Sequence, residues 1–229
     1  MKIVAFDTAT DDTVVGALDG REVTYGFVEG PDVKSRPRHS QSVLGAAEAA
    51  AASLGGWEEV DRIAVGLGPG TFTGIRIGVA TARGLALGPG IEATGFSTLD
   101  ALALGLAEGS DTDASRLAVI DARRGEAFAA LYRPDGTPEW PAAVLEPGEL
   151  CERVAGLGLP VIAGGSGAIR FRDELIRAGA SVAGAEAGIH RLSPDSICET
   201  GAAAGSNDPL EPIYLRLPDA QLWLQRDGK

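Results

Sequence analysis

A glycine-rich segment, residues 66–86 with the sequence GLGPGTFTGIRIGVATARGLA, has the composition of a phosphate-binding loop that leads into a helix. A Walker loop needs a GK[ST] triplet because its lysine must reach the outer phosphates, and the chain has no such triplet. The fingerprint GxGxxG also fails here, because threonines stand where its third glycine belongs. Two alternatives stay open: an anion at the helix N-terminus with Thr71 or Thr73 as cap, and a plain strand–turn–helix joint.

Histidine, serine and cysteine chemistry has few candidates in this chain. The two histidines, His39 and His190, are too far apart for an HxxxH metal pair or for the HExxH of a metalloprotease. We interpret His39 as an N-terminal or capping residue of a helix. Ser166 lies in GGSGA, which is not a GxSxG elbow. Cys151 and Cys198 form no CxxC pair, which indicates reduced thiols and a cytoplasmic location.

Small residues recur every four positions along the helix that follows the loop, at Gly74, Gly78, Ala82 and Ala86. A stripe without bulk lets another helix approach closely, and a core position would gain from larger side chains. A tightly packed core helix is the alternative. We expect the stripe to face another chain together with the alanine-rich helix 39–55, as half of a four-helix contact. The predicted interface residues are Gly74, Ile75, Gly78, Val79 and Ala82 on one helix and Val43, Ala47 and Ala50 on the other.

Two similar runs of secondary structure have to position these residues. The first run predicts three antiparallel strands at 2–10, 13–18 and 22–29, and an Asp-Gly pair marks the hairpin between the second and third. These strands are followed by a helix at 39–55, a strand at 61–68, and helices at 71–86 and 98–109. The second run predicts a strand–turn–strand unit, helix, strand and helix, at 116–136, 148–158, 160–167 and 168–180. We therefore expect two related α/β lobes: residues 1–105, completed by part of 196–217, and residues 106–195, followed by a tail at 218–229.

The charge balance constrains the partners of the chain. Twenty Lys and Arg against 32 Asp and Glu give a formal net charge of −12, and no run of basic residues offsets it. Such a surface repels nucleic acid. Apolar runs stay shorter than the roughly 18 residues of a membrane span, and the N-terminus does not read as a signal peptide. We expect no membrane association and no direct nucleic-acid binding by this chain alone.

Five segments together resemble the TsaB (YeaZ) family: FDTAT, the glycine-rich segment, GFSTLDALA, DARRGEAFAALY and EPIYLR, at 6–10, 66–86, 95–103, 121–132 and 211–216. The match extends from the first strand to the tail, and GPGTFTGIR and DARRGE are its specific parts. The resemblance implies a two-lobed actin-like ATPase fold, shared with sugar kinases and Hsp70. It also implies a role in making threonylcarbamoyladenosine, a modified base beside the tRNA anticodon.

The resemblance further implies that this chain acts by binding partner proteins and does not itself catalyse the reaction. Members of the family dimerise with a catalytic paralogue, TsaD, are joined by a small P-loop ATPase, TsaE, and form homodimers in isolation. The paralogue holds a metal through an HxxxH pair, which this chain lacks. We expect a non-catalytic scaffold and activator subunit that requires no cofactor of its own, with any ATP or ADP placed at the interface of the complex.

In the superfamily, the turn after the first strand faces nucleotide phosphates. The resemblance therefore makes Asp7, Thr8 and Thr10 the predicted nucleotide contacts, and a β-turn that satisfies its own backbone is the alternative. Two rival functions stay open: a stand-alone ATP-using enzyme with Asp7 at the phosphates, and a homodimeric binding module without an enzyme partner.

Five further polar residues have no assigned role from the sequence. Asp121, Arg123 and Glu126 lie at a predicted hairpin, where a solvated turn and a partner contact are both open. Tyr214 and Arg216 lie in the C-terminal segment, where they dock either on a partner or on the N-terminal lobe of the same chain.

Overall fold

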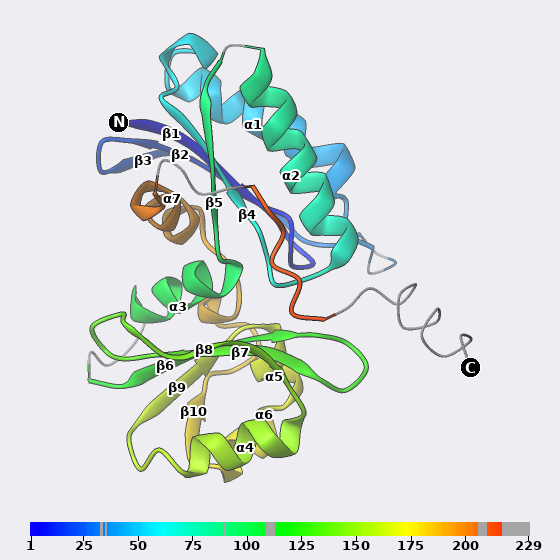
Figure 1. Cartoon of the computed structure of the whole chain (residues 1–229), viewed down its shortest axis with the longest axis vertical. Coiled ribbons are helices and arrows are strands. Elements are labelled where there is room, and N and C mark those ends of the chain that lie inside the picture. The colour runs from blue at the N-terminus through cyan, green and yellow to red at the C-terminus, as the bar shows by residue number, and fades with distance from the viewer. Residues whose placement is uncertain (33, 35, 89, 109–112, 206–209, 217–229) are drawn as a thin grey trace.

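The computed structural model describes residues 1–32, 34, 36–88, 90–108, 113–205 and 210–216 (Figure 1). The described chain forms two lobes, each built around a five-stranded mixed sheet, as the sequence predicts. The predicted tail at 218–229 lies outside the described residues. Within the described ranges, none of the helices combines the length and the apolar character that crossing a membrane requires.

The N-terminal lobe carries the sheet with strand order β3-β2-β1-β4-β5. The hairpins β1–β2 and β2–β3 are antiparallel, as predicted, while β4 and β5 run parallel to β1. The strands are β1 (Lys2–Asp7), β2 (Thr13–Asp19), β3 (Glu22–Glu29), β4 (Arg62–Gly66) and β5 (Glu92–Phe96). Helices α1 (His39–Ser53) and α2 (Phe72–Leu87) cover one face of this sheet, and α7 (Pro194–Ala203) covers the other (Figure 1).

The C-terminal lobe repeats this arrangement with strand order β10-β9-β6-β7-β8. Three antiparallel strands are again followed by strands parallel to the first. The strands are β6 (Ser115–Asp121), β7 (Ala127–Tyr132), β8 (Pro138–Leu145), β9 (Val161–Gly164) and β10 (Ala180–Val182), and the helices are α3 (Thr98–Glu108), α4 (Pro147–Ala155), α5 (Ser166–Arg170) and α6 (Arg172–Arg177). The repetition of the strand order confirms two related lobes.

Alternation along the first strand of each lobe places its side chains in two different cores, because successive residues of a strand point to opposite faces. Ile3 and Ala5 of β1 lie in a core that also contains Ala118 and Ile120 of β6, so this core is shared by both lobes. Helices α3 and α7 lie between the two sheets and contribute to the shared core (Figure 1). The lobes are therefore joined by continuous apolar packing.

Three details of the fold differ from the sequence prediction. Residues 168–180 do not form one helix: the chain breaks at Phe171 into α5 and α6 and then enters β10. Strands β5, β8 and β10 were not predicted. Strand β5 contains Gly95, and β8 begins at a proline with a second proline at Pro141, so both have composition that usually disfavours strands. Both are edge strands, where a missing backbone donor costs little.

Candidate functional site

The glycine-rich segment packs around residues 7–9, at the end of β1. A Cβ atom at Gly66 would lie 1.8 Å from Asp7 Oδ2, and one at Gly70 would lie 2.2 Å from the Ala9 carbonyl oxygen. A Cβ atom at Gly74 would lie 1.9 Å from the Thr8 carbonyl oxygen. Real side chains cannot approach so closely, so these glycines allow the loop and α2 to contact the β1 turn of the same chain.

The backbone of this loop is also bonded within the chain. Thr71 N donates to Ala9 O (2.7 Å) and Thr98 N donates to Gly68 O (2.8 Å). Thr71 is the N-cap of α2, and its hydroxyl accepts a hydrogen bond from Gly74 N (3.3 Å). Of the two interpretations of the glycine-rich segment, the geometry supports the strand–turn–helix joint.

Asp7 is fully buried at the carboxyl end of β1. Its Oδ1 accepts a hydrogen bond from Ala9 N (2.7 Å), and its Oδ2 accepts one from Thr98 Oγ1 (2.7 Å). Burial raises the pKa of this carboxyl, while the hydrogen bonds from Thr98 and Ala9 act in the opposite direction. Both oxygens thus have partners within the chain, and neither is presented to solvent where a metal–phosphate complex would bind.

The other two predicted nucleotide contacts are engaged in the same local structure. Thr8 is fully buried, and its hydroxyl donates to Gly74 O (2.7 Å). Thr10 is partly exposed, and its hydroxyl accepts from Asp12 N (3.3 Å). The geometry of Asp7, Thr8 and Thr10 therefore favours the alternative interpretation, a turn that satisfies its own backbone.

The eight predicted interface residues are all buried inside this chain, so the expectation that they face another chain is wrong at the level of these residues. Gly78 lies over Thr8: a Cβ atom there would come within 2.7 Å of the Thr8 hydroxyl. The other side chains pack with the sheet in the core beneath α1 and α2, and the full set is Val43, Ala47, Ala50, Gly74, Ile75, Gly78, Val79 and Ala82.

The opposite sides of α1 and α2 are exposed, and we call them the outer face. This face has little bulk, because most of its exposed residues are small or polar. The large apolar exceptions on these two helices are Leu44, Phe72 and Leu87, with 53%, 41% and 85% of their surfaces exposed. The exposed residues include Leu44, Gly45, Ala49 and Ala52 on α1 and Thr73, Arg76, Ala80 and Gly84 on α2. Small residues therefore lie on both sides of α1 and α2, on the buried side that packs on the sheet and on the outer face.

The β6–β7 turn contacts the β1–β2 loop across the lobes. Arg123 donates to both carboxylate oxygens of Asp11 (2.8 Å each). Asp121 is held by Arg170 (2.8 Å) and accepts a hydrogen bond from Arg123 N (2.8 Å). Arg191, just before α7, pairs with Asp12 (2.7 Å). The hairpin residues left open by the sequence are thus engaged in ion pairs, and the pair between Arg123 and Asp11 links the two lobes.

The C-terminal segment 210–216 lies along α2 and then reaches the C-terminal lobe (Figure 1). Ile213 N donates to Leu67 O (2.8 Å), and the Tyr214 ring lies 5.4 Å from the Phe72 ring. Arg216 donates to Ala122 O (3.0 Å) and forms an ion pair with Glu126. Tyr214 therefore docks on the N-terminal lobe of its own chain, and Arg216 docks on the C-terminal lobe.

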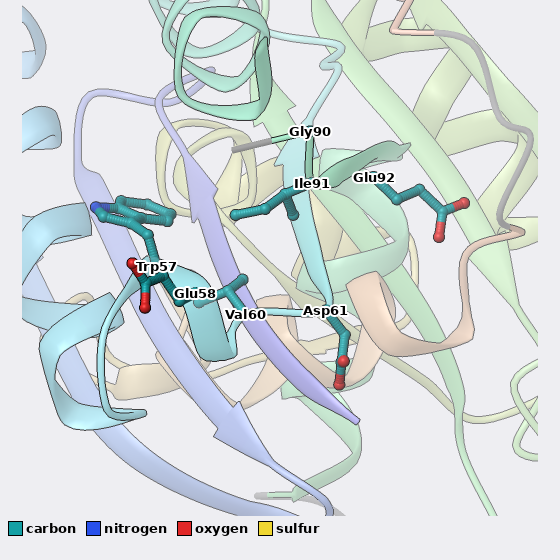
Figure 2. Close-up of a pocket in the computed structure, with 7 residues that line it drawn as sticks. All are labelled: Trp57, Glu58, Val60, Asp61, Gly90, Ile91 and Glu92. Carbon is teal, nitrogen blue, oxygen red and sulfur yellow. The ribbon is translucent and has the colours of Figure 1, made fainter. Parts of the chain in front are cut away.

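A hollow of about 660 Å³ lies at the opposite end of the N-terminal sheet, where β4 and β5 begin (Figure 2). The Trp57 ring and the side chains of Val60 and Ile91 form its apolar part. Asp61 accepts a hydrogen bond from Lys2 N (2.6 Å), and Glu92 pairs with Arg62 (3.4 Å). The sequence contained no signal for this hollow, because its lining comes from two short segments that are far apart in the sequence, residues 57–61 and 90–92.

Among the residues that the structure describes, no three His, Cys, Asp or Glu side chains are grouped so that they could hold a metal ion. His39 is the first residue of α1, and its Nδ1 lies 2.9 Å from the Thr13 hydroxyl. Burial lowers the pKa of His39. His190 is also buried, with Nε2 3.2 Å from Ala183 O.

Comparison with known proteins places the chain in a family. Residues 25–199 match the family described as "TsaD: tRNA N6-adenosine threonylcarbamoyltransferase". The chain is 35% identical over 173 residues to the tRNA threonylcarbamoyladenosine biosynthesis protein TsaB of Escherichia coli K12, covering 73% of this chain and 72% of that protein. The chain belongs to the TsaB (YeaZ) family. The TsaB relative confirms the resemblance carried by the five sequence segments.

Solved structures agree with this placement. An uncharacterized protein of Pseudomonas aeruginosa, described as similar to peptidase YEAZ, superimposes with a TM-score of 0.74 at 25% identity, covering 94% of this chain and 99% of that chain. YeaZ of Pseudomonas aeruginosa superimposes with a TM-score of 0.71 at 22% identity, covering 93% and 100%. The two-lobed α/β fold expected for a TsaB family member is confirmed.

Proposed function

We propose that this chain is a non-catalytic subunit in the synthesis of tRNA N6-threonylcarbamoyladenosine, and that it dimerises with a TsaD-type threonylcarbamoyltransferase. Support comes from the Escherichia coli relative, whose name assigns it to this biosynthesis. The family match over residues 25–199 carries the name of the transferase, which indicates that this chain and the proposed partner are paralogues.

The burial of Asp7 is the observation that carries the non-catalytic part of the proposal. In an ATP-using enzyme of this fold, the aspartate after the first strand would face the phosphates. Here, Thr98 and Ala9 occupy both carboxylate oxygens, and α2 covers the neighbouring Thr8. The two histidines are buried in different parts of the chain, so they supply no HxxxH pair. Transfer chemistry and its metal therefore belong to the partner in this proposal.

The outer face of α1 and α2 is the proposed docking surface. Its alanines and glycines allow the backbones of two further helices to come close, which suits a four-helix contact with the paralogue. The same face would serve a homodimer when the partner is absent. A TsaE-type P-loop ATPase would join the assembled pair, and any ATP or ADP would bind at the interface of the complex.

The negative charge of the chain supports a complex in which the partner, and not this chain, binds the tRNA substrate. A net charge of −12 provides no counterion-release gain on binding a polyanion. Binding of tRNA would therefore depend on the partner, while this chain supports the active arrangement of the complex. We place the complex in the cytoplasm, where tRNA is modified.

Copurification and reconstitution test the proposal together. The tagged chain is expected to retain the TsaD-type protein of the same organism, and threonylcarbamoyl transfer to tRNA is expected to need both. Leu44→Arg and Ala80→Arg add bulk and charge to the outer face and should abolish both effects. Leu159→Arg is the matched control, because Leu159 is 62% exposed on the other lobe.

A chain that retains no partner, or transfer that proceeds equally well without this chain, would contradict the proposed function. Retention that survives both outer-face variants would leave the family role intact and would refute the docking surface. Circular dichroism of each variant confirms that loss of binding does not come from unfolding.

A further inference from the structure

Helix α2 carries only positive charge, although the chain as a whole has a net charge of −12. Between Phe72 and Leu87 the helix contains Arg76 and Arg83 and no acidic residue. The two arginines differ in their contacts. Arg83 donates to Leu210 O (3.0 Å) and thereby holds the C-terminal segment. Arg76 is exposed on the outer face.

The guanidinium of Arg76 is held by two aromatic residues, through stacking on one and a hydrogen bond to the other. Its Cζ atom lies 3.8 Å from the centroid of the Phe72 ring, and its Nε donates to Tyr214 Oη (3.3 Å). Phe72 and Tyr214 are each 41% exposed, which is unusual for such large apolar surfaces. We call these three residues the arginine–aromatic platform. Its stacked geometry fixes the guanidinium before any partner arrives.

The terminal nitrogens of Arg76 have no carboxylate within the described part of the chain. Several other arginines here are paired with Asp or Glu, as Arg123 is with Asp11 and Arg191 is with Asp12. An oriented guanidinium that keeps its two Nη groups available presents a fork that matches the two oxygens of a carboxylate. Because Phe72 and Tyr214 already restrict this side chain, little side-chain entropy is lost on binding.

The platform is built from parts of the chain that are far apart in the sequence. Tyr214 reaches α2 because Ile213 N is bonded to Leu67 O and because Arg83 holds Leu210. Arg216, two residues after Tyr214, is fixed to the C-terminal lobe by its contacts with Ala122 O and Glu126. Both lobes therefore determine the position of the Tyr214 ring and, through it, of the Arg76 guanidinium.

We propose that Phe72, Arg76 and Tyr214 bind a single carboxylate on a helix of the partner subunit, at the edge of the outer face. The inference rests on the proposed function, since it takes the partner to be the TsaD-type paralogue. A protein carboxylate fits better than a nucleic-acid phosphate, because one available guanidinium cannot offset the −12 of the chain against a polyanion. The adjacent small-residue face accepts the helix that carries the carboxylate.

Affinity for the partner, measured by isothermal titration calorimetry at low and moderate salt, tests the platform. Arg76→Ala is expected to raise the Kd by about tenfold or more and to reduce its salt dependence, because it removes one charge pair. Arg76→Lys should recover only part of the loss, since an ammonium lacks the fork and stacks less well. Arg153→Ala, which removes another exposed arginine, this one on α4, should leave the Kd unchanged.

Each result separates the inference from the proposed function. An Arg76→Ala variant that binds like the wild type overturns the platform while the proposed function stands. An Arg76→Ala variant that binds more weakly but with an unchanged salt dependence overturns the inference that Arg76 pairs with a carboxylate of the partner. Retention of tRNA by the chain alone in an Arg76-dependent manner assigns the platform to phosphate and also overturns the inference. A wild-type chain that binds no partner refutes the proposed function itself.

Discussion

Gly74 provides the sharpest test of how the glycine-rich segment packs. A methyl group at this position would lie 1.9 Å from the Thr8 carbonyl oxygen, 3.0 Å from the Thr8 carbonyl carbon and 2.6 Å from the Thr71 hydroxyl. The Thr8 atoms belong to the backbone, which cannot move without shifting the end of β1. The change Gly74→Ala therefore overpacks a buried joint and displaces the cap of α2.

The magnitude follows from four contributions. Overpacking of a well-packed core costs about 1–3 kcal/mol. Displacement weakens the bond from the Thr8 hydroxyl to Gly74 O (2.7 Å), about 1 kcal/mol, and the Thr71 cap, about 1 kcal/mol. Alanine regains about 1 kcal/mol over glycine in a helix. The net loss is about 2–4 kcal/mol, or roughly 5–15 °C in Tm for a chain of this length.

Gly84 supplies the matched control in the same helix. It is exposed, and nothing lies within 4 Å of the position of its Cβ atom. Gly84→Ala is expected to stabilise the chain by about 0.5–1 kcal/mol through helix propensity alone. Urea unfolding followed by circular dichroism compares the two variants. If Gly74→Ala proves as stable as Gly84→Ala, the close contact between α2 and the β1 turn is wrong.

Three further predictions concern buried and charged groups. Burial raises the pKa of Asp7, so the wild type should lose stability relative to Asp7→Asn as the pH rises above 3.8, and parallel urea midpoints for the two proteins would contradict this. Burial lowers the pKa of His39, so the wild type should lose stability as the pH falls below 6.5, and His39→Asn should lose less. Equal losses of stability in the two proteins would show that protonation of His39 is not the cause. The isolated chain should release no phosphate from ATP above background, and turnover that Asp7→Asn abolishes would revive the stand-alone enzyme.

The sequence predicted those parts of the fold that depend on local signals. Asp19 and Gly20 between two β-rich runs predicted the β2–β3 hairpin, and Gly20 adopts the positive φ of 64° that such a turn uses. The missing GK[ST] triplet excluded a Walker loop before any geometry was available. Strands β5 and β10 were not predicted, because each is short and lies at the edge of a sheet. Their pairing is set by neighbouring strands instead of by their own composition.

The sequence by itself determined that α2 has a stripe of glycine and alanine, that two lobes repeat one pattern and that the surface is acidic. Only the tertiary structure decided what the stripe contacts: Gly74 and Gly78 lie against Thr8 of the same chain, while Arg76 and Ala80 face outward. The physical reason is that a glycine permits close approach by any backbone and does not specify which one. That choice depends on contacts between residues far apart in the sequence, as does the docking of Tyr214 on Phe72.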